Sequence, residues 1–398
     1  MKNTSLILYL EINDSNYIFY VGKNDEQNDF QTVYEFKTPL IGITNNRVSD
    51  SDEAFKIVKE NIYLIEQKFN YTFKEIILIL DNFRPTFINL TGFKKLNGSQ
   101  ILKENITYIL NTLKSCVNNI EYKKTVLHIF NTKFYLDKKK IENLPIGLFG
   151  DFYSHELSFT LINTNDVKNL NSIFDKCNLK VKKILIKSFI QGVNTSDNYK
   201  NKDTFFQIIM NKNSSKIFYF ENNSLKLEQC FNFGTDIVIQ DISKITSLKI
   251  DTVSTILDQI EVNENMSDNE LIDEKFFTEC SYRKIKKKLI YEIALARIKE
   301  ISELMIFKNI NLKYYANPPK DIFLDINHKL QLKCLKKIYK KVFSSNDRFN
   351  INFIDNLLNE SMVSSAHKLV HFGWKKEAIP VSQVKKSIIA VFFDKIFG

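Results

Sequence analysis

Two copies of one local pattern constrain the fold of this chain more than any other feature. The stretch "LYLEINDSNYIFYVG" predicts a strand over Leu6–Ile12, a tight polar turn and a second strand over Tyr17–Gly22. The stretch "DTFFQIIMNKNSSKIFYFENNSLKLEQCFNFG" predicts strand, polar turn, strand, short turn and strand. These hairpins stand about 195 residues apart, which predicts a duplicated fold with two facing lobes, although their residues are not alike.

The residues around the hairpins alternate helical and strand patterns, which predicts the α/β class. Residues 50–69 begin with acidic capping residues and repeat apolar residues at helical spacing, and "KEIILILD" is typical of a buried strand. Residues 82–163 predict a small α/β insert. The later patterns predict a helix and a strand over 165–188, a long helix over 282–306, a strand, turn and helix over 320–343, and a helix over 364–374.

Length and composition limit the class of protein. The 398 residues leave room for two or three domains or one large two-lobed domain, and 44% hydrophobic residues allow a sizeable core. The N-terminal apolar run is too short for a signal peptide, and no run of about 20 apolar residues could span a membrane as a helix. The cysteines form no CxxC pair, so we expect neither disulfides nor a zinc site. This pattern fits a protein of the reducing cytoplasm. They are Cys116, Cys177, Cys230, Cys280 and Cys334.

The charge balance and the histidines exclude several kinds of site. A formal net charge of +10 favours an anionic partner, either nucleic acid or a lipid surface. The lysines are spread out and form no basic-aromatic stripe, so we expect no nucleic-acid partner. His367 and His371 could share a helix face, but no third ligand or neighbouring glutamate accompanies them, which favours a structural role over a metal site. Walker A and GxGxxG motifs are absent.

The last sixteen residues, "QVKKSIIAVFFDKIFG", predict an amphipathic helix at a membrane surface. The segment is too short to span a bilayer, and a terminal helix docked on the protein's own core is the alternative. Its charge of +2 is worth about 2 kcal/mol at an anionic leaflet, so firm binding would need many anchors on one polymer. The residues expected at the membrane are Val384, Lys385, Lys386, Ile388, Ile389, Val391, Phe392, Phe393, Lys395, Ile396 and Phe397.

The order and spacing of these segments resemble, nearly end to end, the FtsA family of actin-like bacterial proteins that tether the FtsZ ring to the membrane. "LPIGLFGDFYSHELSFTLINTNDVKNLNSIFDKCNLKVKKILIKS" is similar to the family's segment that closes the inserted subdomain 1C, and "SKIFYFENNSLKLEQCFNFGTDIVIQDISKITSLKI" to its second phosphate hairpin and the following helix. The tail falls where the family has its membrane-targeting helix. The resemblance implies a two-lobed actin-like (actin/Hsp70 ATPase) fold with a 1C insert and a C-terminal amphipathic helix.

The resemblance also implies the domain boundaries. Subdomain 1A would comprise 1–81, 164–200 and a last helix over 359–374, with subdomain 1C inserted as 82–163. Subdomain 2A would comprise 201–228 and 306–358, and subdomain 2B would comprise 229–305. A linker over 375–382 would lead to the membrane helix over 383–398.

The expected nucleotide loops depart from the family pattern. The first loop, Asp-Ile-Gly-Thr-Thr/Ser-Lys in the family, is Glu11 to Asn16 here, and the second loop has lost its glycines and its carboxylates. Asparagine tolerates positive φ, so Asn13, Asn211 and Asn213 are expected to keep the turn shapes. Without the carboxylates that hold Mg²⁺ we expect no hydrolysis, while binding of ATP stays open. The candidate cofactor-binding residues are Asn13, Asp14, Ser15, Asn16, Asn213, Ser214, Ser215, Lys216, Gly234 and Asn327.

The resemblance implies a division protein that tethers FtsZ polymers to the cytoplasmic face of the inner membrane at the septum and self-associates. The FtsZ C-terminal peptide would dock on subdomain 2B, with Arg297 and Glu300 on the contact helix, and other divisome proteins on the 1C insert. The alternative for Arg297 and Glu300 is an ion pair along one helix face. Two rival functions remain: an active actin-like ATPase of cell division, and a pilus-assembly scaffold of the PilM type, against which the tail argues.

Overall fold

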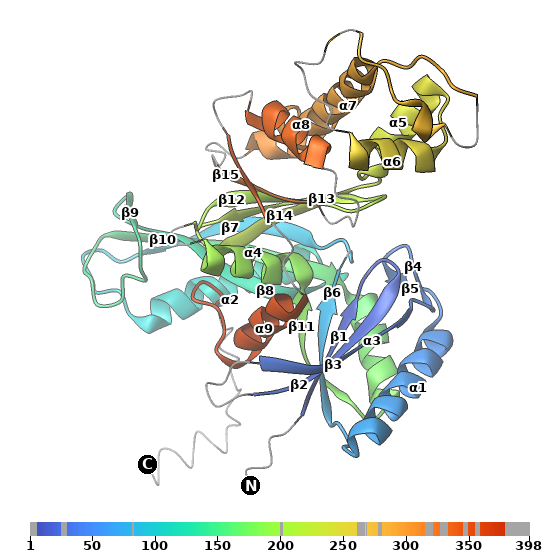
Figure 1. Ribbon diagram of the computed structural model, residues 1–398. Helices are drawn as coiled ribbons and strands as arrows, with labels where there is room; N and C mark the ends of the chain where they lie inside the picture. Colours follow the sequence, from blue (N-terminus) through green and yellow to red (C-terminus); the bar gives the residue numbers. More distant parts are fainter. Residues whose placement is uncertain are drawn as a thin grey trace, which may run out of the picture. The chain divides into compact units, whose positions relative to one another are not determined.

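The computed structural model describes residues 6–24, 30–81, 83–199, 202–260, 267, 269–277, 281–314, 321–326, 333–344, 349–354 and 359–378. The chain forms two compact units (Figure 1). Unit 1 comprises Met1–Phe87 and Asn165–Gly373, and unit 2 comprises Ile88–Thr164 and Trp374–Gly398.

The first lobe of unit 1 is built on a five-stranded sheet in the order β11-β6-β1-β2-β3. β1, β2 and β3 form an antiparallel meander, and β6 and β11 continue the sheet parallel to β1. The strands are β1 (Ile7–Ile12), β2 (Asn16–Asn24), β3 (Phe30–Pro39), β6 (Glu75–Leu80) and β11 (Lys180–Ile186), beside a small hairpin of β4 (Ile43–Thr44) and β5 (Arg47–Val48).

Helices cover both faces of this first sheet. The pair α1 (Ser51–Phe69) and α3 (Thr164–Lys176) lies on one face, and the pair α4 (Lys187–Asn198) and α9 (Asn359–His371) lies on the other (Figure 1). α1 forms where the sequence predicts it, because Asp50 caps its first turn by accepting from the N–H groups of Asp52 and Glu53. Its helical stripe, Ala54, Val58, Ile62 and Ile65, is buried.

The second lobe of unit 1 repeats the same topology. Its sheet has the order β14-β13-β12-β15-β16, again an antiparallel meander followed by two parallel strands. The duplicated fold predicted from the two hairpins is therefore confirmed. The strands are β12 (Phe205–Met210), β13 (Ser215–Glu221), β14 (Ser224–Phe231), β15 (Asp321–Ile326) and β16 (Asn350–Phe353). The helices packed on one face are α5 (Asp236–Thr246), α6 (Ile250–Gln259), α7 (Lys287–Ser302) and α8 (Lys333–Ser344).

Several elements differ from the sequence predictions. Helix α4 and strand β3 were not predicted, although the burial of β3 alternates along the strand. The helix predicted from Tyr282 begins only at Lys287, since Leu271 and Lys286 form a β-bridge and Ile285 is buried before the helix starts. Within the predicted insert, helix α2 begins at Lys103, because the preceding loop is hydrogen-bonded to residues 147–150.

Unit 2 contains a four-stranded sheet in the order β7-β10-β8-β9, packed against α2 (Lys103–Ile120). The strands are β7 (Thr86–Lys95), β8 (Lys124–Leu136), β9 (Lys139–Ile141) and β10 (Phe152–Asn163). In the part of the chain that the structure describes, every helix is too short or too polar to cross a bilayer. The predicted membrane helix over 383–398 lies outside the described residues.

A segment from Trp374 to Ala378, here called the docked segment, adds to the edge of this sheet. Glu377 forms a β-bridge with Phe130, and the N–H groups of Asn131 and Ala378 donate 2.7 Å hydrogen bonds to Lys376 and Ile129. The Glu377 carboxylate lies 2.8 Å from Nδ1 of His128, whose side chain is fully buried. These contacts fix, on unit 2, the point from which the last twenty residues continue.

Replacing Glu377 by Ala should release the docked segment, because it leaves the buried His128 without its carboxylate at a cost of about 1–3 kcal/mol. Hydrogen exchange should then accelerate at Asn131 and Ala378. Lys375→Ala, an exposed change in the same segment, is the control and should leave both amides protected. Equal protection in Glu377→Ala and the unchanged chain would show that the carboxylate does not hold the segment.

Candidate functional site

The candidate site begins where parallel strands of the first sheet end. β1, β6 and β11 are parallel, so the residues after β6 and β11, Asp81 and Lys187, emerge at one sheet edge with Glu11 of β1. Ligand sites of open α/β sheets form at this edge. The second lobe contributes Lys216 from β13 and Glu228 from β14.

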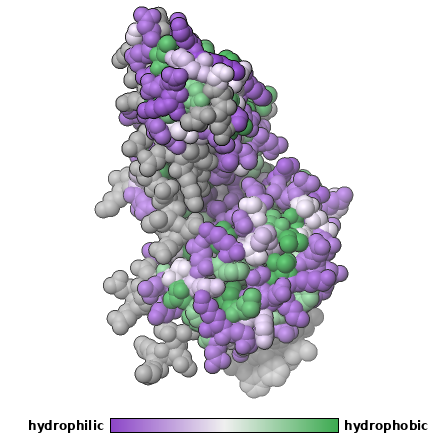
Figure 2. Space-filling model, turned by 45° about the vertical axis from the view of Figure 1, so that its right-hand side comes forward, coloured by the Kyte–Doolittle hydropathy of each residue, from purple (hydrophilic) through white to green (hydrophobic). Residues whose placement is uncertain are grey.

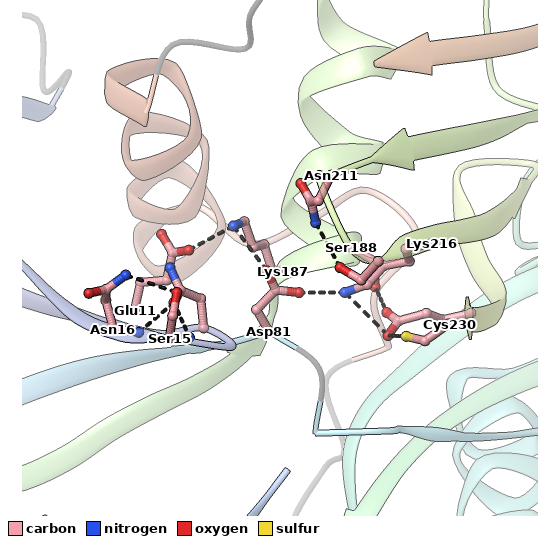
Figure 3. Close-up of polar contacts among 12 residues, drawn as sticks. Glu11, Ser15, Asn16, Asp81, Lys187, Ser188, Asn211, Lys216 and Cys230 are labelled. Atoms are coloured by element: carbon pink, nitrogen blue, oxygen red, sulfur yellow. Dashed lines mark hydrogen bonds and ion pairs between the residues drawn. The ribbon is translucent and has the colours of Figure 1, made fainter. Parts of the chain in front are cut away.

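These five side chains form a continuous series of ion pairs, here called the charge chain (Glu11, Lys187, Asp81, Lys216, Glu228). Nζ of Lys187 lies 2.7 Å from Oε1 of Glu11 and 3.1 Å from Oδ2 of Asp81. Lys216 donates a hydrogen bond to Asp81 and lies 3.5 Å from Oε1 of Glu228. Figure 3 shows the two lysines meeting Asp81 from either side. Ser188 donates to the other oxygen of Glu228.

The charge chain is buried, so its charges depend on one another. Burial alone would raise the pKa of Asp81, but Lys187 and Lys216 lower it well below its ordinary value. Burial alone would lower the pKa of each lysine, but Asp81, with Glu11 for Lys187 and Glu228 for Lys216, raises it above its ordinary value. Both lysines therefore stay protonated at neutral pH. Three carboxylates and two ammonium groups give the chain a formal charge of −1.

In the first predicted nucleotide loop, the side chain of Asn13 occupies the backbone N–H groups of the turn. Oδ1 of Asn13 accepts the backbone N–H groups of Ser15 at 3.0 Å and Asn16 at 2.8 Å. A phosphate-binding turn aims such N–H groups at the phosphate. The prediction that Asn13, Asn211 and Asn213 keep their turns through positive φ is wrong: none of them is among the positive-φ residues of the described chain, which include Asn45 and Asn46. Asn13 instead folds its turn with a side-chain carbonyl.

The second predicted loop is closed as well. The N–H of Asn211 donates to the Ser214 carbonyl at 2.9 Å, and Oγ of Ser215 donates to the Phe233 carbonyl at 2.7 Å. A Cβ at Gly234 would lie 2.2 Å from the Asn211 carbonyl oxygen, so only glycine permits this approach. The N–H of Thr235, which opens α5, donates to that same carbonyl at 3.0 Å. Gly234 thus serves the packing of the turn.

A polar cavity of about 310 Å³ joins both loops and the charge chain. Of the predicted cofactor-binding residues, Asp14, Ser214, Ser215 and Lys216 line it, together with Asp81, Arg84 and Lys187, which the sequence did not single out. Asn213 is exposed at the turn, and Asn327 lies outside the described residues.

This site does not fit a magnesium–nucleotide complex. The turn N–H groups of Ser15, Asn16 and Asn211 already have protein acceptors. Both lysines that line the cavity are ion-paired to Asp81, so their charges are already offset within the protein. Within the described ranges no group of three or more His, Cys, Asp or Glu side chains is arranged to hold a metal ion.

Two other predicted positions have partners within the chain. Arg297 on α7 donates from Nε to Asp241 of α5 and from Nη1 to Oε2 of Glu300 at 2.6 Å, so the ion pair along one helix face exists and extends to a second helix. Nδ1 of His367 lies 2.8 Å from the Tyr9 hydroxyl in the core of the first lobe, and the ring of His371 is 4.1 Å away. These contacts give the histidines a structural role.

Asp325, at the end of β15, is a buried carboxylate of a different kind. Burial raises its pKa to about 6, although Lys187 and Lys336 oppose the shift. A carboxylate with a raised folded-state pKa destabilises the fold once pH exceeds its unfolded-state pKa of 3.8. The loss of folding free energy grows as pH rises from 3.8 towards 6 and does not increase further above that pH.

Asp325→Asn should therefore stabilise the protein at pH 7 to 8, by at most about 3 kcal/mol, and have little effect near pH 4. Denaturant unfolding across this range measures the difference. Asp258→Asn, an exposed change, is the control and should give no comparable gain in stability at pH 7 to 8. A gain that is largest at pH 4 would contradict the assigned shift.

No family model matches the chain. It is 20% identical over 417 residues to the cell division protein FtsA of Buchnera aphidicola subsp. Schizaphis graminum (strain Sg), with 99% of this chain and 97% of the relative covered. It is 20% identical over 414 residues to FtsA of Buchnera aphidicola subsp. Acyrthosiphon pisum (strain APS), covering 100% and 96%.

A solved structure of a PilM-PilN type IV pilus biogenesis complex resembles the fold. Its TM-score is 0.51 at 10% identity, covering 92% of this chain and 96% of that one, and at this identity the likeness concerns the fold alone. The predicted two-lobed α/β architecture is confirmed by this likeness and by the repeated sheets. The chain is therefore a distant homologue of the cell division protein FtsA, with the actin-like ATPase fold.

Proposed function

We propose that this protein is a cell division scaffold that links FtsZ polymers to the cytoplasmic face of the inner membrane and works without hydrolysing nucleotide. The observation that carries the proposal is the extent of the relationship to FtsA, which includes 99% of this chain and 97% of the relative. The alignment extends over nearly the full length of both chains.

The site supports a scaffold rather than an enzyme. Hydrolysis of ATP needs carboxylates that hold Mg²⁺ and orient water. At the described positions, Lys216 stands where the family's second loop ends in a carboxylate, and it is ion-paired to Asp81. The rival function of an active ATPase therefore finds no support in the geometry.

The proposed parts follow the expected order along the chain. We assign unit 2, Ile88–Thr164 with the docked segment, to the expected 1C insert, which would bind other divisome proteins. The last sixteen residues would be the membrane helix. Because they follow closely after the docked segment, a force transmitted from the membrane through this helix would act on unit 2.

The FtsZ peptide is proposed to dock on the α5–α7 side of the second lobe. Arg297 retains guanidinium N–H groups beyond those used by Asp241 and Glu300, and an acidic peptide could accept them. Since Arg297 already has two carboxylate partners, its charge would contribute to orientation and association rate more than to affinity.

Self-association would give the weak membrane anchor its strength through avidity. Apolar side chains stand among charged ones on the molecular surface (Figure 2). On the first lobe, Tyr63 and Leu64 of α1 are 59% and 57% exposed. These two adjacent side chains are proposed to contribute to the contact between copies of the chain.

Titration of ATP or ADP into protein lacking Gln383–Gly398 should show no saturable binding up to millimolar concentration, with or without Mg²⁺. Calorimetry measures binding, and phosphate release measures turnover. Asn13→Gly is an informative companion, because it releases the N–H groups of Ser15 and Asn16. Micromolar binding or turnover by the unchanged chain would sink the proposal of a nucleotide-independent scaffold.

Vesicles containing phosphatidylglycerol should recruit FtsZ polymers only when the full chain is present. Deleting Gln383–Gly398 should abolish recruitment, and Phe392→Asp should reduce it strongly because it places a charge on the predicted apolar face. Asp394→Asn, on the predicted polar face, is the matched control and should still recruit. Equal sedimentation of the deleted and full chains would refute the tether.

A further inference from the structure

We propose that the charge chain is a built-in latch, in which Lys216 holds the two lobes of unit 1 in one fixed relation without nucleotide or metal. This inference rests on the proposed function. It explains what the site does in a protein whose residues do not fit a magnesium–nucleotide complex. The latch concerns the folded chain alone and does not depend on FtsZ or a membrane.

The latch is reciprocal, because each lobe supplies both a donor and an acceptor. Lys216 of the second lobe donates to Asp81 of the first, and Ser188 of the first lobe donates to Glu228 of the second. Figure 3 shows the contact between Lys216 and Asp81. Separating the lobes would break both contacts together.

Because the latch residues are largely buried, they favour the arrangement in which Lys216 and Asp81 are paired. The side chains of Lys216 and Glu228 are 8% and 1% exposed, and Lys187 completes the pairing of Asp81. Removing one member of a buried ion pair leaves an uncompensated charge, which is strongly unfavourable. Lys187 pairs with Glu11 and Asp81 within the first lobe, and Lys216 pairs with Glu228 within the second. The pair of Lys216 with Asp81 forms only when both lobes contribute.

Helix α4 connects the latch residues to the sheet of the second lobe. A Cβ at Gly192 would lie 2.4 Å from the Phe220 ring of β13, and Oγ1 of Thr195 donates to Gln207 of β12 at 2.8 Å. The middle of α4 is thus packed against the second sheet, while its first residues, Lys187 and Ser188, belong to the latch. The two loops and the cavity lie at this N-terminal end of α4.

The two closed loops support the same conclusion. Asn13 accepts the N–H groups of Ser15 and Asn16, and the Ser214 carbonyl accepts the N–H of Asn211, so these contacts hold the turns without a ligand. An actin-like protein that is switched by nucleotide needs a site whose groups lack partners when the ligand leaves. Here the protein supplies those partners itself, and its conformation should not respond to ATP.

A double-mutant cycle tests the latch in the full chain. Lys216→Met and Asp81→Asn should each lower the thermal unfolding midpoint by about 5–10 °C. Each should also accelerate hydrogen exchange at 13–16 and 211–215. The double variant should lose less than the sum of the two, because it removes both charges of one pair. Adding Mg²⁺ and ATP should change neither readout in any variant.

An ion pair within the second lobe is the matched control. Nζ of Lys202 lies 2.7 Å from Oδ2 of Asp321, so Lys202→Met removes a pair of similar length inside one lobe. This variant should leave exchange at both loops unchanged. If Lys216→Met does not fold, Ser188→Ala removes the reciprocal contact without charge and should produce the same loop exchange at smaller amplitude.

Unchanged loop exchange in both Lys216→Met and Ser188→Ala would overturn the latch, and so would strictly additive losses in the cycle. Protection of the loops by Mg²⁺ and ATP in the unchanged chain would overturn it too, by showing that a ligand closes the site. None of these results bears on recruitment of FtsZ to vesicles, so failure of the latch is distinguishable from failure of the tether.

Discussion

The pairing of Lys216 with Asp81 is the interaction on which the rest of the candidate site depends. An ammonium group buried among carboxylates is stable only if each charge has a partner, since an isolated ion in the interior costs several kcal/mol. Lys187 and Glu228 supply the remaining partners, and Glu11 and Ser188 complete the series. The site is thus filled by the protein's own charges, and the space that remains is small and polar.

This arrangement changes what the actin-like fold can do. In a nucleotide-driven protein of this shape, the ligand would connect the lobes, and its hydrolysis would alter their relation. In this chain Asn13 takes the N–H groups of the first turn, the Ser214 carbonyl takes one from the second, and Lys216 supplies the positive charge between the lobes. Control of assembly would then have to come from outside the site, through density on the membrane and binding of the partner polymer.

The sequence predicts the fold better than the site, and the reason is physical. Hairpins and amphipathic helices are local, so the patterns at Leu6–Gly22 and 203–234 are enough to predict two lobes of similar topology. Asp14, Ser214, Ser215 and Lys216 could also be found, because they occupy the predicted turns. Asp81 and Lys187 carry a weaker signal. Asp81 follows a buried strand, and Lys187 follows a strand whose last two residues are buried, at the edge where the parallel strands end. Glu228 carries no such signal.

The role of Lys216 could not be predicted from the sequence alone. Its partner Asp81 is 135 positions away, and no local pattern records such a pairing. Lys216 is the only basic residue among the candidate cofactor-binding residues. In the structure its ammonium group already pairs with Asp81 and Glu228, and in the proposed latch it takes the place of a nucleotide between the lobes.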